Sequence, residues 1–185
     1  MTFVIVLVAI LAVVVGAVVA MYNGLVRARL QVTNAWAQID VQLKRRYDLI
    51  PNLVNAVKGY MKFEQETLTK VIEARAKAVS ATAIPDKIKA EGELSGVLSK
   101  LFALMENYPD LKANQNVLAL QEELTTTENQ LAFARQHYND SVMAYNTKIQ
   151  VFPSNIIAGM GNFQPSTFFS APEAEKAVPK VDLAL

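Results

Sequence analysis

The sequence contains no cysteine and a single histidine, His137, among its 185 residues. Without cysteine, the chain has no disulfide, thiol nucleophile, iron–sulfur cluster, thiolate zinc site or lipid-modified cysteine. Charge of one sign is also lacking, because 18 basic and 17 acidic side chains leave a net charge of +1. A dedicated nucleic-acid-binding protein needs a basic surface. With 52% hydrophobic residues, the composition instead favours a membrane protein, and it predicts no nucleic-acid partner.

A long apolar run opens the chain. From Phe3 to Met21 no side chain is charged or strongly polar, and as a helix this run spans ~28 Å, close to a ~30 Å hydrocarbon core. A cleavable signal peptide is the alternative, but the run exceeds the usual apolar core of such peptides and no Lys or Arg precedes it. We therefore expect residues 1–24 to be a retained transmembrane anchor with its junction.

Basic side chains follow the apolar run. Arg27 and Arg29 lie close to it, and the run 44–46 (KRR) lies further on, so the positive-inside rule places the body in the cytoplasm and the N-terminus outside. Arg27 and Arg29 are expected to reach lipid headgroups. The run 44–46 lies ~30 Å further along a straight helix, so we expect it to pair with Asp48 or with acidic side chains of later helices.

Small residues recur at four-residue spacing along one side of the apolar run. Such a stripe lets two helices approach closely in a membrane, although Ala and Gly are common in any membrane helix. The stripe predicts transmembrane packing at Ala12, Gly16, Ala20 and Gly24.

Three amphipathic helices are predicted after the anchor, about residues 25–79, 86–107 and 114–150. Their apolar residues step by three or four, as in a heptad seam of coiled-coil type. Pro51 interrupts the first helix, and we expect a break or kink there that is either a simple helix end or a functional hinge. The connections are short, so the fold class predicted is all-α: an N-terminal transmembrane helix followed by an elongated antiparallel three- to four-helix bundle.

The first predicted helix, ~80 Å long, is too long for the other two to cover. Its apolar stripe is therefore covered either by folding back at Pro51 or by another subunit. For the second case, a homo-oligomer, we expect the contacts to be made by helix residues and by aromatic residues of the C-terminal segment: Trp36, Ile39, Leu43, Phe163, Phe168 and Phe169.

The C-terminal segment, residues 151–185, is rich in Pro and Phe. Residues 152–169 carry more large apolar side chains than a disordered tail normally has. We expect them to pack on the bundle or on a neighbouring subunit in an irregular or extended form. The last stretch, about 171–185, is expected to be mobile.

Two long motifs give the chain a family resemblance. AWAQIDVQLKRRYDLIPNLV lies within Tyr22–Glu64, and YN-x-x-V-x-x-YN lies within His137–Phe163; both stretches resemble the bacterial LemA family over nearly the whole chain. The resemblance implies a bacterial single-span membrane protein with a helical-bundle body, and hence the inner membrane. It implies no catalytic residue and no established activity.

Candidates for chemistry are few. His137 has Asp140 one turn away, but HExxH spacing is absent, and a half-buried or surface histidine is the simpler interpretation. We predict no catalytic, cofactor or metal site and identify no small-molecule substrate. The leading hypothesis is a non-enzymatic membrane-anchored scaffold that self-associates and binds protein partners, including other membrane proteins. A lipid-surface sensor using Arg27, Arg29 and the run 44–46 is the alternative, and an enzyme centred on His137 is the weakest.

Overall fold

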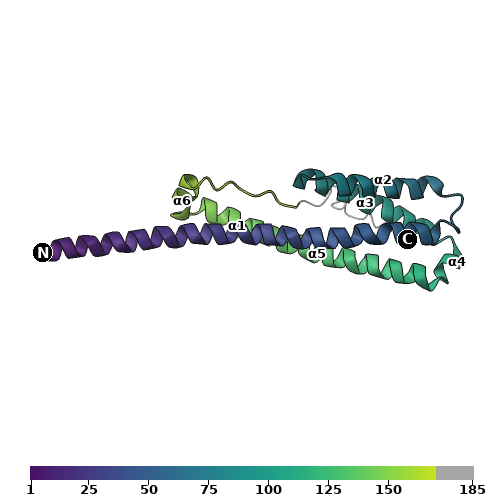
Figure 1. Cartoon of the computed structure of the whole chain (residues 1–185), viewed down its shortest axis with the longest axis horizontal. Coiled ribbons are helices and arrows are strands. Elements are labelled where there is room, and N and C mark those ends of the chain that lie inside the picture. Colours follow the sequence, from purple (N-terminus) through teal and green to yellow (C-terminus); the bar gives the residue numbers. More distant parts are fainter. Residues whose placement is uncertain (170–185) are drawn as a thin grey trace, which may run out of the picture. The chain divides into compact units, whose positions relative to one another are not determined.

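The computed structural model describes residues 1–169, which form helices and no strand (Figure 1). This confirms the predicted all-α fold class. The expectation of mobility for 171–185 lies outside the described residues. The helices are α1 (Thr2–Val57), α2 (Gln65–Ser80), α3 (Ile84–Met105), α4 (Pro109–Lys112), α5 (Gln115–Gln150) and α6 (Ser154–Met160).

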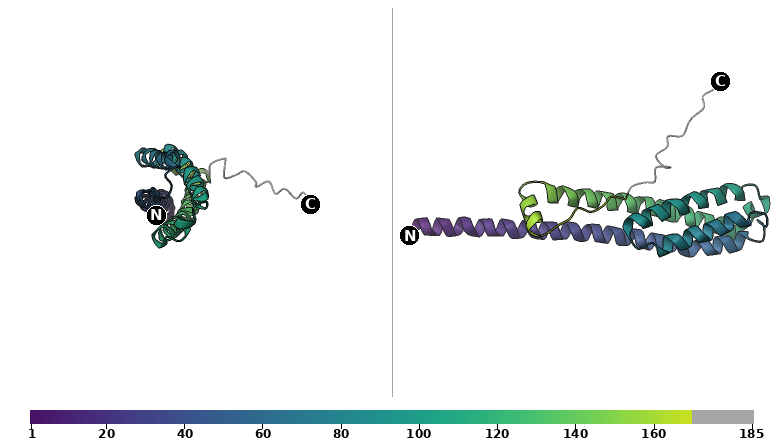
Figure 2. Two further views of the ribbon diagram at one scale, coloured as in Figure 1. Left: turned by 90° about the vertical axis from the view of Figure 1, so that its right-hand side faces the viewer. Right: turned by 90° about the horizontal axis from the view of Figure 1, so that it is seen from above.

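The chain divides into two compact units, and α1 and α5 contribute to both. The first unit comprises residues 1–41 and 132–168. Within it, the part of α1 that follows the apolar run lies antiparallel to the end of α5 (Figures 1 and 2). The Trp36 and Tyr138 rings meet edge to face, with centroids 5.3 Å apart. Its buried side chains include Leu25, Ala28, Val32, Ala35, Ile39, Tyr138, Val142, Tyr145, Ala158 and Phe163.

The second unit is built on residues 42–131. It combines the end of α1, the helices α2, α3 and α4, and the first part of α5, and α2 packs along α3 (Figure 1). Each large apolar side chain buried here contributes about 1.5–3 kcal/mol of transfer free energy. The core includes Leu43, Ile50, Leu53, Val57, Met61, Val71, Leu94, Leu101, Leu111, Val117 and Leu131.

Pro51 lies inside α1, which continues to Val57. Of the two alternatives for Pro51, the simple helix end therefore does not apply, and the chain turns at residues 58–64. Proline has no N–H for the carbonyl oxygen four residues earlier, that of Tyr47. Arg75 of α2 replaces the missing donor, since its Nε donates to the Tyr47 carbonyl oxygen at 2.7 Å. This bond holds the helix at the position where the sequence predicted an end or a hinge.

The apolar stripe of α1 is covered by the chain itself. Trp36 of this stripe is half-buried, and the stripe residues around it are buried: Val32, Ile39, Leu43, Tyr47, Ile50, Val54 and Val57. The turn at 58–64 brings α2 back, and Met61 within the turn is fully buried. No second subunit is needed to cover this stripe.

Residues 152–169 pack on the helices of their own chain, partly in a form the sequence did not predict. A cis Phe152–Pro153 peptide bond follows α5, and α6 comes next. Extended residues follow, and we call residues 164–168 the strap. The expectation of an irregular or extended segment is correct for the strap and wrong for α6.

Candidate functional site

The apolar segment Phe3–Met21 is the part of α1 with the least protein around it. Its most apolar 18-residue window has a mean hydropathy of 3.3 and no buried residue. Among the described residues, α1 is the one helix long and apolar enough to cross a membrane. Such a segment has the length and composition of a membrane anchor. The predicted small-residue stripe lies on it, and a Cβ added at Gly16 or Gly24 would meet no atom within 4 Å.

An aromatic and cationic junction follows the apolar segment. The Phe163 ring lies edge to face against Tyr22, with centroids 5.7 Å apart, and the Arg29 guanidinium lies 5.0 Å from the Phe163 centroid. These cation–π and aromatic contacts join the chain after α6 to the first turns beyond the apolar segment. A Cβ at Gly161 would come within 2.6 Å of the Phe163 ring, so this approach needs glycine.

Three side chains of α5 hold the strap by its backbone. Tyr138 Oη donates to the Thr167 carbonyl oxygen and Tyr145 Oη to that of Gln164, each at 2.8 Å. Asn146 bonds Ser166 in both directions, with Nδ2 donating to the carbonyl oxygen and Oδ1 accepting from the N–H, each at 2.9 Å. Tyr138, Tyr145 and Asn146 are three of the four Tyr and Asn residues of the YN-x-x-V-x-x-YN motif, which thereby gains a structural role.

Burial changes the acidity of both tyrosines. Burial raises the pKa of Tyr138 above its usual value of 10.0. Burial also raises the pKa of Tyr145, although the nearby charge of Arg29 acts in the opposite direction. Removal from water disfavours the phenolate, so both hydroxyls stay protonated and donate to the strap at neutral pH.

A buried ion pair lies in the second unit. The side chains of Arg46 and Glu91 are 4% and 1% exposed, and Arg46 Nη1 lies 3.1 Å from Glu91 Oε2. Arg46 Nη1 also lies 3.1 Å from Glu128 Oε2, and Nη2 donates to Ser95 Oγ at 2.8 Å. The Tyr47 hydroxyl donates to the other Glu91 oxygen. The paired charges come from three helices, so the cluster links α1, α3 and α5.

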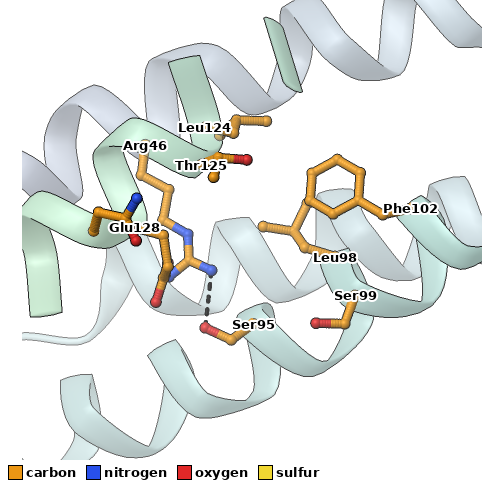
Figure 3. Close-up of a pocket in the computed structure, with 9 residues that line it drawn as sticks. Arg46, Ser95, Leu98, Ser99, Phe102, Leu124, Thr125 and Glu128 are labelled. Carbon is orange, nitrogen blue, oxygen red and sulfur yellow. Dashed lines mark hydrogen bonds and ion pairs between the residues drawn. The ribbon is translucent and has the colours of Figure 1, made fainter. Parts of the chain in front are cut away.

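A cavity of about 310 Å³ opens beside this cluster, between α3 and α5. Figure 3 shows Arg46 reaching Ser95 at one side and the Phe102 ring at the other. Its lining mixes hydroxyl, amide, charged and apolar groups: Arg46, Ser95, Leu98, Ser99, Phe102, Leu124, Thr125, Glu128 and Asn129. The charged groups Arg46 and Glu128 in this lining are paired with each other.

Comparison with known proteins agrees with the motifs. The sequence model of the LemA family matches residues 35–183. The chain belongs to the LemA family. It is 28% identical over 157 residues to Protein LemA of Metamycoplasma hominis, which covers 83% of this chain and 71% of that relative. The predicted resemblance is therefore confirmed.

More distant relatives of this LemA-family chain carry magnetosome names. Magnetosome protein MamQ 2 of Paramagnetospirillum magneticum is 22% identical over 70% of this chain and 57% of its own length. Magnetosome protein MamQ of Magnetospirillum gryphiswaldense is 22% identical over 80% of this chain and 64% of its own length. The chain thus spans less than two thirds of the magnetosome relatives.

Most of the predicted oligomer contacts lie inside the LemA-family fold. Ile39, Leu43, Phe163 and Phe169 are buried within the chain, so in this conformation they are not available to a second copy. Ile39 and Leu43 were predicted from an apolar stripe that the chain covers itself, and Phe163 and Phe169 from the aromatic residues of the C-terminal segment. Of the other two, Trp36 is half-buried beside Tyr138, and Phe168 is partly exposed.

The basic residues and the histidine that the sequence singled out differ in exposure and in pairing. Arg27 and Arg29 are exposed next to the apolar segment. In the run 44–46, Arg45 pairs with Glu123 and Arg46 with Glu91, as expected for pairing with later helices. His137 is exposed on α5.

Sequence reasoning missed the buried ion pair and the strap contacts. Glu91 occupies the place between Ile88 and Leu94 in the apolar stripe of α3. A carboxylate at such a position signals a buried partner, and this signal was present. Nothing in the sequence singled out Arg46 within its basic run, because its burial depends on the packing of α3 and α5.

Proposed function

We propose that this LemA-family chain is a non-enzymatic, single-pass membrane-anchored helical protein that self-associates through its anchor and presents its body to protein partners. One contrast carries the proposal. The apolar stripes of the body's long helices are mostly buried within the chain, whereas the apolar segment Phe3–Met21 is exposed over almost all of its length. Exposed apolar surface of this extent needs lipid or another helix around it.

Self-association is assigned to the anchor. The apolar stripe of α1 beyond the apolar segment and the Phe163 side chain are largely buried within the chain. Ala12, Gly16 and Ala20, in contrast, are exposed on the apolar segment. Two such helices gain van der Waals contact when small residues let their backbones approach. The proposed homo-oligomer is therefore a pair or ring of anchors with separately folded bodies.

Partner binding is assigned to the cavity between α3 and α5. Its hydroxyl and amide groups, including those of Ser99, Thr125 and Asn129, offer donors and acceptors beside the Phe102 ring. A protein segment with its own backbone polar groups matches this lining. Other membrane proteins are the natural candidates, because the anchor restricts the body to the bilayer surface.

The proposed location is the bacterial inner membrane, with the body in the cytoplasm. Arg27 and Arg29 are exposed directly after the apolar segment, with Lys44 and Arg45 further along α1. Basic residues near a span remain on the cytoplasmic side in most single-span proteins.

The absence of cysteine makes a direct test simple. Single cysteines at Ala12, Gly16 and Ala20 are expected to form disulfide-linked dimers in oxidised native membranes, whereas matched cysteines at Val14 and Val18, on other faces, remain monomeric. Gly16→Leu is expected to abolish the crosslinks at Ala12 and Ala20. Equal crosslinking at all five positions, or none at any, would contradict self-association through this stripe.

A lipid-surface role is the second candidate, favoured by the exposed Arg27 and by Arg29, which Phe163 orients. The run 44–46 no longer supports it, because Arg46 is buried and Arg45 is paired. If this role operates, the chain released from mixed-lipid nanodiscs retains anionic lipids in native mass spectrometry, and Arg27→Gln with Arg29→Gln removes them. Retention without preference for anionic lipid would reject it.

A further inference from the structure

The turn between α5 and α6, together with α6, carries an exposed apolar surface that the fold does not use. We call residues 149–160 the tip. Phe152 and Met160 are 80% and 83% exposed, and Val151 and Ile156 are about half exposed. Large side chains exposed to this degree and grouped within a few residues mark a binding surface.

The tip lies in a stretch without charge. No Asp, Glu, Lys or Arg occurs from Ile149 to Phe169. In the first unit, the acidic residues are Asp40 and Asp140, whereas Arg27, Arg29 and Lys148 are close in sequence to the apolar segment or to the tip. An apolar surface bordered by cations and free of acids matches the boundary of a bilayer that contains anionic lipid.

The helices of the first unit place the tip beside the end of the apolar segment. Trp36 of α1 contacts Tyr138 of α5, and the two helices run antiparallel there (Figures 1 and 2). Gln150 lies about 18 Å along α5 from Tyr138, and Gly24 lies about 18 Å along α1 from Trp36 in the same direction. The end of α5 is therefore level with residues close to Met21.

A second contact independently places the tip at the same height along α1. Phe163 follows α6 and packs on Tyr22 and Arg29, the first turns beyond the apolar segment. Phe163 is itself held close, since its N–H donates to the Ala158 carbonyl oxygen at 3.0 Å. Figure 1 shows α6 beside α1 at this point.

We propose that the tip is a second membrane contact, inserting Phe152, Ile156 and Met160 into the boundary between headgroups and acyl chains of the same bilayer. The partner is lipid, because the tip lies where the headgroup region begins if Phe3–Met21 fills the hydrocarbon core. This inference rests on the proposed membrane anchor. Two separate attachments then fix the orientation of the first unit on the membrane, which one helix alone does not do.

Tryptophan fluorescence tests this in the full chain. The sole tryptophan, Trp36, is replaced by Phe, and one new tryptophan is introduced as Phe152→Trp or Met160→Trp. The chains are reconstituted in vesicles of phosphatidylglycerol and phosphatidylcholine, with or without bromine near the top of the acyl chains. Both tip variants are expected to lose most of their emission to bromolipid, to emit at shorter wavelength than in water, and to resist quenching by iodide.

Two matched variants make the outcome unambiguous. Val19→Trp, in the apolar segment, reports insertion of the anchor, and Phe133→Trp, on an exposed part of α5 further from the tip, reports a body position in water. Quenching of Val19→Trp by bromolipid, with both tip variants behaving like Phe133→Trp, would overturn the second contact and leave the anchor standing. Failure of Val19→Trp to be quenched would overturn the anchor, and the inference with it.

Discussion

Arg75 of α2 donates from Nε to the carbonyl oxygen of Tyr47 at 2.7 Å, the oxygen that Pro51 leaves without its helical partner. The same Tyr47 bonds Glu91 of α3 through its hydroxyl. One residue of α1 therefore joins two other helices, once through its backbone and once through its side chain. This arrangement explains how α1 continues past a proline to Val57.

Arg75 and Pro51 are predicted to be energetically coupled. Arg75→Ala should lower the free energy of unfolding by about 1–2 kcal/mol, because a part-buried carbonyl loses its donor. After Pro51→Ala the backbone supplies that donor, so the same Arg75 substitution should cost less. Urea unfolding of the four chains in detergent measures the difference, and the exposed Lys70→Ala serves as control. Strictly additive costs would contradict the proposed compensation.

We predict that the fold needs Arg46 to neutralise the buried carboxylate of Glu91. Arg46→Met should destabilise the second unit by about 3–5 kcal/mol, because it leaves a carboxylate buried without its cation. Adding Glu91→Gln to Arg46→Met should recover a large part of this loss, although either substitution alone is harmful. Thermal unfolding by circular dichroism measures the effect. A double variant as unstable as the sum of the two single variants would refute the pairing.

Asn146 is predicted to control the strap without affecting the rest of the fold. Asn146→Ala removes both bonds to Ser166, so hydrogen exchange at the Ser166 amide should quicken roughly tenfold to a hundredfold. Asn146→Asp keeps the acceptor and should have a smaller effect, and the exposed Thr147→Ala should have none. Unchanged exchange in Asn146→Ala would show that the strap is held elsewhere.

Stability is predicted to fall in strong alkali through Tyr138 and Tyr145. Burial raises their pKa values in the folded chain, so the folded chain holds the two phenolic protons more tightly than the unfolded chain does. The stability that this difference provides is fully present below the unfolded pKa of about 10. It is lost as the pH rises through the higher pKa values of the folded chain. A chain with both tyrosines changed to Phe should be less stable at neutral pH but should lose less stability as the pH rises above about 10. Parallel losses in both chains would disagree with this assignment.

The sequence predicted the features that depend on repeated local patterns. The apolar segment follows from uninterrupted hydrophobicity, and α5 follows from a stripe that runs from Val117 to Ile149; its observed bounds, Gln115–Gln150, differ little from the 114–150 expected. These patterns are legible because each turn of helix repeats the same requirement.

What the sequence did not predict depends on contacts between distant residues. The break or kink near Pro51 was predicted from proline's local cost, which Arg75, 24 positions later, offsets. α6 is too short for a periodic pattern, and its position depends on Phe163 reaching Tyr22. Ile39 and Leu43 were predicted as oligomer contacts because apolar periodicity marks a buried face without saying which chain buries it, and here the chain itself buries them.

The central claim is that Phe3–Met21 lies in a bilayer and holds the body on its cytoplasmic side. The cysteine-free chain allows a direct measurement: maleimide labelling of single cysteines placed through α1, in intact cells and after the inner membrane is opened. We predict protection throughout Phe3–Met21 under both conditions, and labelling at Asn23 and Gln31 only after opening. Labelling within Phe3–Met21, or recovery of a mature chain that lacks it, would contradict the account.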